Sequence, residues 1–176
     1  MDEILLVEDN PDDVELTLMQ SLCAMSHLDF RQKATHDYHQ FFQTIRQLDI
    51  GAAALGQGFR RMAFNVMARN CDDHTKNFAF LLAEDGRWQL APAYDVTLAY
   101  NPRGEWTSQH QMSVNGRFAE ITRADLLVVA DRFGIASATR SLNAVRDAVA
   151  GWPDCARQAG LDKPDIRRVA QLHRSV

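Results

Sequence analysis

One stretch decides the fold class of this chain, and it runs from residue 55 to residue 96 as LGQGFRRMAFNVMARNCDDHTKNFAFLLAEDGRWQLAPAYDV. Its first part carries apolar residues at helical spacing, which predicts an amphipathic helix over Leu55–Arg69. The apolar runs FAFLL (78 to 82) and WQL (88 to 90) then flank AEDGR, whose Asp-Gly pair is typical of a hairpin turn. The predicted order is helix, polar loop and β-hairpin.

The polar loop, residues 70 to 77, reads NCDDHTKN and holds two carboxylates, an imidazole, an ammonium and two carboxamides. Asp72 and Asn77 stand five positions apart in it, and Asp95 follows just after the hairpin. A hairpin brings its two ends together. We therefore expect the loop before the hairpin and the aspartate after it to face one site.

This spacing is typical of phosphoryl transfer of the protein-kinase type. In that chemistry an Asp accepts the proton of the attacking hydroxyl, an Asn five residues later binds one Mg²⁺, and a second Asp beyond a hairpin binds another. Asp72, Asn77 and Asp95 match these three positions, and Lys76 can offset phosphate charge. Their oxygen atoms suit Mg²⁺ and leave coordination positions open for phosphates and water.

The strings NCDDHTKNF and LAPAYDV also carry a family resemblance. Together with the sequence from roughly residue 21 to residue 160, they resemble the C-terminal kinase lobe of HipA-family serine/threonine kinases, the toxin halves of bacterial toxin–antitoxin pairs. The resemblance implies that Asp72 is the general base and that Asn77 and Asp95 bind metal and cofactor. It implies supporting roles at the loop and the phosphates for His74 and Lys76.

The same resemblance implies the cofactors and partners of the chain. Mg²⁺ and ATP would be the cofactors, and the substrate would be a protein such as an aminoacyl-tRNA synthetase. A small DNA-binding antitoxin would be a further partner, while the chain itself would contact neither nucleic acid nor membrane. The implied fold class is mainly α with a small β-hairpin (α+β), a protein-kinase-like C-lobe of HipA type with a short N-terminal β-α appendage.

The appendage is predicted from a second resemblance at the start of the chain. The segment MDEILLVEDNPDDVELTLM resembles the first strand and helix of response-regulator receiver domains, with a strand over residues 4 to 7 and a helix from Pro11. Glu8 and Asp9 would be its acidic pair. No phosphoacceptor strand or downstream Lys strand follows, so a working receiver is the least favoured reading. The predicted division is residues 1–20, receiver-like, and residues 21–176, the kinase lobe.

The family's N-terminal lobe has no counterpart in this sequence, because no glycine-rich loop between two strands is found. The nucleotide would then have half a site, and we expect weak or no activity from the chain alone. Two functional classes remain open. One is a HipA-type kinase lobe, and the other is a non-catalytic binding module or pseudokinase remnant that binds a metal or a partner.

Further helices and one further strand are expected around the site. DYHQFFQTIRQL (37 to 48) has clear helical periodicity with Asp37 as N-cap, and Thr122 starts a capping-box pattern into a helix that ends at Gly134. Helices are also predicted over residues 137–150 and 164–174, and HQMSV (110 to 114) predicts a strand.

Composition narrows the class of protein. The net charge of −4 and the pI near 5.8 argue against a general nucleic-acid binder, whose phosphate contacts require excess Lys and Arg. Three scattered cysteines, Cys23, Cys71 and Cys155, suit reduced thiols rather than a disulfide framework. No apolar run approaches the roughly 18 residues of a membrane span. The expected location is the cytoplasm.

The remaining polar and aromatic residues have structural interpretations. Asp73 either caps the loop or pairs with an arginine, and His74 organises the loop rather than shuttling protons. The aromatic residues near the hairpin are expected in the core: Phe78, Phe80, Trp88 and Tyr94. A solvated face is expected for Arg60, Arg61 and Arg69, and no usable spacing is found for His27, His36, His39, His110 and His173.

Overall fold

The computed structural model describes residues 3–10 and 13–176, and the side chains from Leu18 onward. Along the chain it forms β1 (Glu3–Asn10), β2 (Asp13–Ser21), α1 (Leu22–Met25), β3 (His36–Asp37), α2 (Tyr38–Gln47), α3 (Gly51–Ala68), the 3-10 turn η1 (Thr75–Asn77), β4 (Ala79–Leu82), β5 (Trp88–Leu90), β6 (Met112–Ser113), α4 (Arg123–Arg132), α5 (Ala138–Ala150), α6 (Trp152–Gln158) and α7 (Lys163–Ala170). The fold is α+β, as the sequence predicts.

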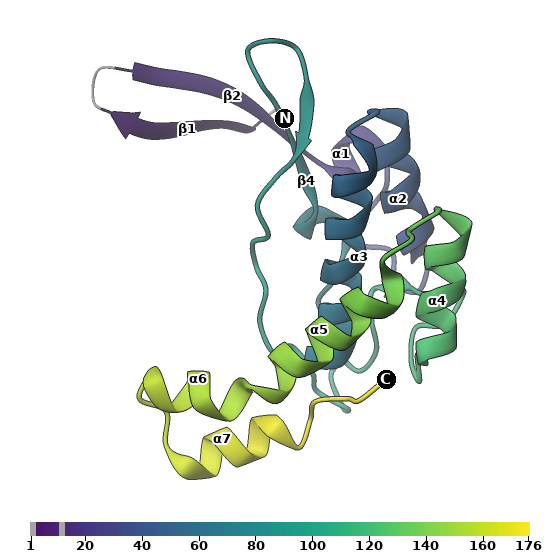
Figure 1. The fold of residues 1–176 in the computed structure, drawn as a ribbon, viewed down its shortest axis with the longest axis vertical. Helices are drawn as coiled ribbons and strands as arrows, with labels where there is room; N and C mark the ends of the chain where they lie inside the picture. Colours follow the sequence, from purple (N-terminus) through teal and green to yellow (C-terminus); the bar gives the residue numbers. More distant parts are fainter. Residues whose placement is uncertain (1–2, 11–12) are drawn as a thin grey trace.

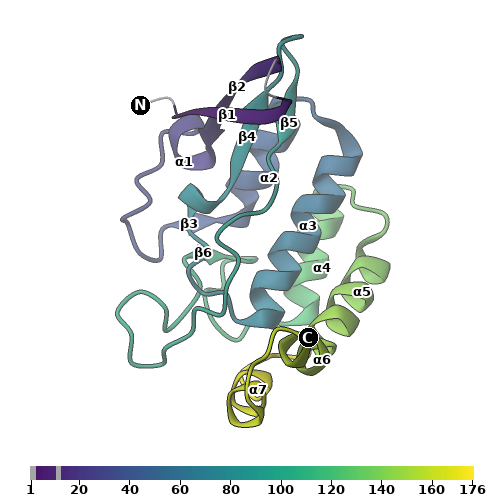
Figure 2. The same ribbon diagram turned by 90° about the vertical axis from the view of Figure 1, so that its left-hand side faces the viewer.

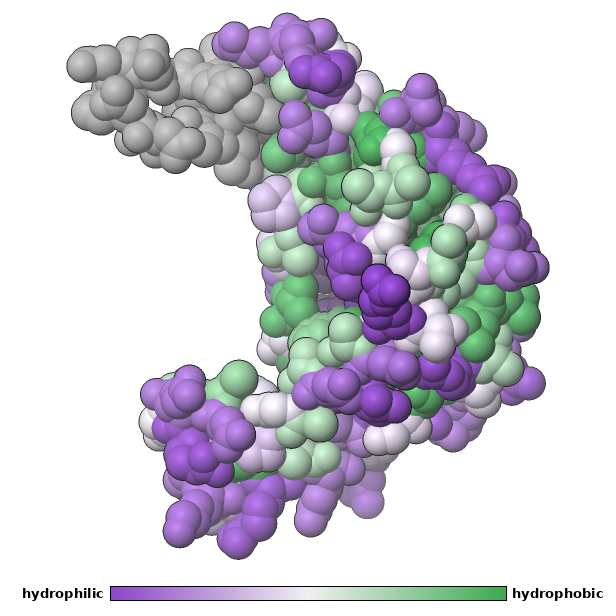
Figure 3. Space-filling model, in the orientation of Figure 1, coloured by the Kyte–Doolittle hydropathy of each residue, from purple (hydrophilic) through white to green (hydrophobic). Residues whose placement is uncertain are grey.

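A four-stranded antiparallel sheet of order β1-β2-β4-β5 closes one end of the molecule, and α6 and α7 lie at the other end (Figures 1 and 2). The predicted hairpin is confirmed as β4 and β5. The register pairs Ser21 with Ala79, so the end of β2 lies beside the strand that leaves the polar loop. The side of the molecule between the two ends is hollowed and carries hydrophobic residues (Figure 3).

The N-terminal appendage is a β-hairpin, and the helix predicted after the first strand is wrong. The predicted start of that helix, at Pro11 and Asp12, lies outside the described residues, but Asp13–Ser21 is strand β2. The reason is visible in the sequence, because Val14, Leu16 and Leu18 alternate with Glu15 and Thr17. That period of two is the pattern of a strand.

Helices α2 and α3 form the centre of the core. Asp37 accepts from His39 N at 2.6 Å and Gln40 completes a capping box, which confirms the predicted start of α2. Helix α3 begins one turn before the predicted start at Leu55, at Gly51. The two helices pack through fully buried side chains: Phe41, Phe42, Ile45, Phe59, Met62 and Val66. The long helix α3 contacts both α2 and α5 (Figure 2).

Gly58 permits the close approach of α2 to α3. A Cβ at Gly58 would lie 2.9 Å from Phe41 Cε1 and 3.2 Å from Ile45 Cδ1. Gly58→Ala is therefore expected to destabilise the protein by about 1–3 kcal/mol through overpacking, measured by urea denaturation. Gly56→Ala is the matched control, because its Cβ would meet only Arg60 Nη1 at 3.9 Å. The control should stabilise by about 0.5–1 kcal/mol through helix propensity, and equal effects of both variants would contradict this packing account.

The C-terminal helices follow the predicted caps with one addition. Thr122 and Asp125 form the expected capping box of α4, and Gly134 follows its end with φ of +67°. Helix α5 ends at Ala150 as predicted, and a further helix, α6, starts at Trp152, because a proline is tolerated in the first turn of a helix. Beyond α7, Arg174 N donates to Met67 O at 2.8 Å and ties the C-terminal segment to the end of α3.

Candidate functional site

The polar loop begins where α3 ends, and main-chain hydrogen bonds fix it there. Arg69 ends the helix in the left-handed conformation with φ of 59°, which turns the chain sharply. Cys71 N then donates to Ala99 O at 3.0 Å, and Ala99 N donates to Arg69 O at 3.1 Å. The start of the loop is thus bound to the segment that follows the hairpin.

Asp72 and Asn77, the predicted base and metal ligand, are joined directly. Asn77 Nδ2 donates to the main-chain oxygen of Asp72 at 2.9 Å, across the single turn of η1. This bond uses the amide nitrogen and leaves the Oδ1 of Asn77 as an open acceptor. The Asp72 side chain is 42% exposed, so its carboxylate remains accessible at the surface of the loop.

Asp95 is carried by the segment after β5, which is anchored at two points. Arg61 Nη2 donates to Ala91 O at 2.5 Å, and Tyr94 Oη donates to Lys76 O at 2.5 Å. Between Tyr94 and Val96 the exposed Asp95 adopts a left-handed φ of 51°, a conformation that is uncommon outside glycine and frequent at functional sites. The anchors bring the segment of Asp95 onto the loop that holds Asn77.

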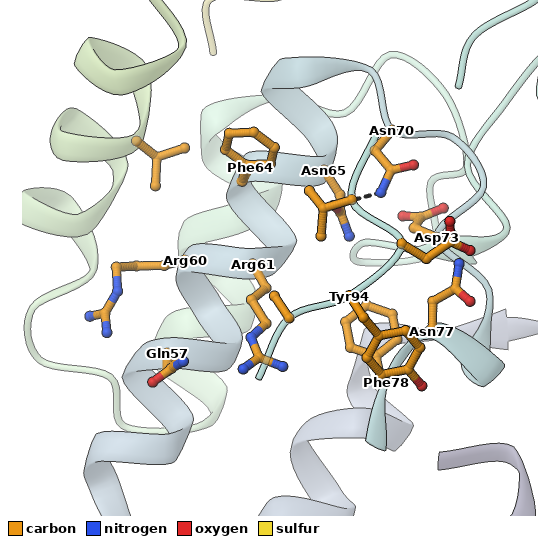
Figure 4. A pocket seen from close by; sticks show the side chains of 14 residues that line it. Gln57, Arg60, Arg61, Phe64, Asn65, Asn70, Asp73, Asn77, Phe78 and Tyr94 are labelled. Carbon is orange, nitrogen blue, oxygen red and sulfur yellow. Dashed lines mark hydrogen bonds between the residues drawn. The ribbon is translucent and has the colours of Figure 1, made fainter. Parts of the chain in front are cut away.

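Two cavities of about 500 Å³ each meet at these residues, and Asn77, Tyr94 and Asp95 line both. The first, which we call the helix-side cavity, lies between α3, α5 and the segment 93–96 (Figure 4). The second, the loop-side cavity, lies between the end of β2, the start of α1 and the polar loop. The two predicted metal ligands therefore share one wall, while Asp72 contributes its main chain to the loop behind that wall.

His74 and Lys76 line the loop-side cavity beside Phe30. The His74 ring lies 5.7 Å from the Phe30 ring, and Lys76 Nζ lies 5.5 Å from the same ring. His74 Nε2 is 3.9 Å from Asp72 Oδ1, which is longer than a hydrogen bond. The lining of this cavity is mixed, with apolar side chains from Met19, Ala24 and Phe30 and polar ones from Lys76 and the metal-ligand wall.

Beneath the loop lies a buried polar network centred on Asp73, whose side chain is fully buried. Asp73 accepts from Tyr38 Oη at 2.8 Å and from Gln111 N at 2.8 Å, and it pairs with His110 Nδ1 at 2.9 Å. Asn65 extends the network by donating to Tyr38 Oη at 3.0 Å. Asp73 is therefore neither a loop cap nor the partner of an arginine, and its cation is a histidine.

The electrostatics of this network favour a charged pair. Burial alone disfavours the imidazolium form of His110, but the Asp73 carboxylate outweighs burial and raises the pKa of His110 to about 10. Burial, followed by the nearby Asp73 charge, holds the pKa of Tyr38 well above its usual range. At neutral pH His110 is therefore protonated beside Asp73, and Tyr38 remains a neutral donor.

Three contributors to the site were misplaced or missed by the sequence analysis. Tyr94 was expected in the core, but it is 37% exposed because its hydroxyl spans to the polar loop. Arg61 was expected on a solvated face, but it is half-buried and anchors Ala91. His110 lies far from the motif in sequence, and no spacing signal could have linked it to Asp73.

The donor set fits a hard divalent cation. Asn77 Oδ1 and the Asp95 carboxylate are oxygen ligands that line the same cavities, and Asp95 forms no ion pair within the described residues. In the described part of the chain, no group of three or more His, Cys, Asp or Glu is placed to bind a metal. The pair would thus leave most coordination positions to phosphate oxygens and water, as Mg²⁺ requires.

Helix, polar loop and hairpin, followed by an aspartate on the wall that both cavities share, define an α+β lobe with one polar site. Residues 9–169 match the family model of the HipA-like C-terminal domain, and the chain belongs to that family. No curated protein sequence matches the chain.

Among solved structures, the HipA chain of the Shewanella oneidensis MR-1 toxin–antitoxin complex of HipA, HipB and operator DNA has a similar fold. The TM-score is 0.66 at 16% identity, over 97% of this chain and 48% of that one. The chain therefore spans about half the length of this structural neighbour. No helix among residues 3–10 and 13–176 is long and apolar enough to cross a membrane.

Proposed function

We propose that this chain carries the metal-binding and proton-accepting half of a HipA-type serine/threonine kinase, which transfers a phosphoryl group from ATP to a protein hydroxyl. The observation that carries the proposal is the hydrogen bond from Asn77 Nδ2 to the Asp72 main chain, with Asn77 and Asp95 on one wall. The bond links Asp72 to Asn77, and Asn77 shares its wall with Asp95, which supports the three roles that phosphoryl transfer of this type requires.

Each side chain has a defined task in this proposal. The accessible Asp72 carboxylate takes the proton of the substrate hydroxyl, and His74 lies 3.9 Å from that carboxylate as a support of the loop. Asn77 Oδ1 and Asp95 would hold Mg²⁺, which would neutralise charge on the transferred phosphoryl group when bound. The exposed ammonium of Lys76 offsets further phosphate charge.

The loop-side cavity is the proposed nucleotide site. Its apolar side chains, from Met19, Ala24 and Phe30, suit a planar base, and Lys76 with the shared wall suits phosphates. The register of β2 with β4 supports this choice, because it sets the end of β2 beside the strand that leaves the polar loop. A nucleotide in this orientation would have its phosphates directed at Asn77 and Asp95.

The test is calorimetric titration of the purified chain with Mg-ATP. Wild type is expected to bind, and Asp95→Ala is expected to weaken binding by about tenfold or more, because it removes a charged metal ligand. Asp131→Ala is the control, since Asp131 is an exposed aspartate on α4. Equal Mg-ATP affinity of wild type and Asp95→Ala would show that Asp95 is not a metal ligand. No binding of Mg-ATP by wild type would contradict the nucleotide proposal.

A second proposed function is binding of an antitoxin-like DNA-binding protein. It is favoured by the Shewanella HipA structure, which is a complex with HipB and operator DNA. The match to this chain covers 48% of that HipA chain. In this proposal the chain is a binding module that needs no phosphoryl transfer. Co-purification of the chain with a protein encoded beside its gene supports it, provided that Asp72→Asn co-purifies equally well.

A further inference from the structure

The helix-side cavity carries a feature that the kinase proposal does not use. Gln57, Arg60 and Arg61 come from successive turns of α3 and line one side, while Asn77, Phe78 and Tyr94 line the other (Figure 4). The side chains of Arg60 and Arg61 lie on opposite sides of the α3 ribbon, Arg61 on the side of Phe78 and Tyr94 and Arg60 on the side of α5 (Figure 4). A guanidinium group thus borders the cavity on each side of the helix.

The charge of the lining favours an anion. Neither Arg60 nor Arg61 forms an ion pair with any side chain that the structure describes. On the opposite side the charge of Asp73 is balanced by His110, so Asp95 is the one unbalanced carboxylate among the described lining residues. Two guanidinium groups against one carboxylate leave a net positive charge.

A buried donor without a partner points to an anion in this cavity. Within the described residues, Arg61 Nε is buried and has no hydrogen-bond partner, and Arg61 lines the cavity. Its Nη2 already donates to Ala91 O, so the Nε–H is the buried donor that remains. Buried donors are normally satisfied, so this N–H requires an acceptor.

The other part of the lining is apolar. Phe64, Phe78, Val96 and Val145 line the same cavity as the arginines. A volume of about 500 Å³ accommodates a small organic molecule. The cavity therefore combines guanidinium forks, which match phosphate geometry, with a wall that suits an apolar body.

We propose that the helix-side cavity is a second binding site, separate from the nucleotide site, for a phosphate monoester with an apolar body. Arg61 binds the phosphate through its Nε–H, Arg60 adds positive charge from the other side of α3, and the wall formed by Phe64, Val96 and Val145 holds the apolar part. Because Tyr94 and Asp95 line this cavity and the loop-side cavity alike, a ligand here contacts the wall that carries the metal ligands. The site needs neither ATP nor phosphoryl transfer. Its test is therefore independent of the test of the proposed kinase function.

The test is an NMR titration of the ¹⁵N-labelled full chain with phenyl phosphate and, separately, with inorganic phosphate. Mg²⁺ and nucleotide are left out, so that phosphate cannot bind through a metal at Asp95. Wild type is expected to bind phenyl phosphate about tenfold more tightly than inorganic phosphate, since only the ester uses the apolar wall. The shifted amides should lie in α3 and in residues 93–96.

Variants of the two arginines locate the phosphate. Arg61→Gln is expected to weaken phenyl phosphate binding about tenfold or more, and Arg60→Gln about fivefold. Arg61→Gln also removes the bond to Ala91 O, whereas Arg60 is exposed and its substitution leaves that anchor intact. Arg87→Gln is the matched control, because Arg87 lies on the hairpin turn and pairs with Asp85.

Three results would overturn the proposal. One is the absence of saturable shifts in wild type at tens of millimolar ligand. Another is equal affinity for phenyl phosphate and inorganic phosphate, which would mean that the apolar wall takes no part. The third is binding by Arg60→Gln that equals binding by wild type and by Arg87→Gln, which would place the phosphate elsewhere on the surface.

Discussion

Replacing His110 by Gln is expected to lower the free energy of unfolding by about 3–5 kcal/mol, because it leaves the buried Asp73 carboxylate without its cation. Asp73 is fully buried and His110 is 4% exposed, so water cannot take the place of the lost partner. Tyr38 and the Gln111 main chain would still donate to Asp73, but neither carries a charge. Urea denaturation at pH 7 measures the change.

His27→Asn is the matched control for this variant. His27 is exposed and has a left-handed φ of 52°, a conformation that Asn tolerates. The control should change stability by less than about 0.5 kcal/mol, as surface substitutions usually do. A loss of less than about 1 kcal/mol in His110→Gln would contradict a charged pair at this position.

The same pair gives stability a pH dependence of defined sign. Burial of His110 opposes its charge, but the Asp73 carboxylate raises the folded-state pKa from the usual 6.5 to about 10. Because the folded pKa exceeds the unfolded one, this stabilisation is fully present below pH 6.5 and is lost as pH rises through about 10. Wild type should therefore lose stability over this interval more steeply than His110→Gln, and parallel profiles would contradict the assignment.

Replacing Asp72 by Asn is expected to lower the rate of phosphoryl transfer by about 10²–10⁴-fold, the usual loss when a general base is removed. Asn is isosteric, and the structural bond from Asn77 reaches the main chain of residue 72, so the loop should keep its shape. The measurement is transfer of γ-³²P from ATP to a protein substrate, with a complete nucleotide-covering lobe added in trans. Unchanged Mg-ATP affinity in Asp72→Asn would show that the variant is defective in chemistry alone.

Asp85→Asn is the control for Asp72→Asn, because Asp85 lies on the exposed hairpin turn. Equal rates in wild type and Asp72→Asn would exclude Asp72 as the base. Absence of transfer in wild type, with and without the added lobe, would contradict the kinase proposal and favour the binding module.

Local sequence patterns were sufficient for most elements around the site. The capping boxes at Asp37 and Thr122 determine where α2 and α4 begin, because their side chains satisfy main-chain groups within four residues. The hairpin of β4 and β5 follows from two apolar runs and a turn. The one clear failure was β2, where a proline and two aspartates indicated a helix start and the alternation of Val14, Leu16 and Leu18 was overlooked.

By itself, then, the sequence determined the family and the order helix, polar loop, hairpin and aspartate, because both depend on residues that are close along the chain. Only the tertiary structure decided which distant groups complete the site. His110 reaches Asp73 across 37 positions, and Arg61 reaches Ala91 across 30, through the packing of α3 and the return of the chain past the polar loop. Contacts of this kind depend on how the whole lobe packs. They therefore produce no characteristic residue spacing by which the sequence could predict them.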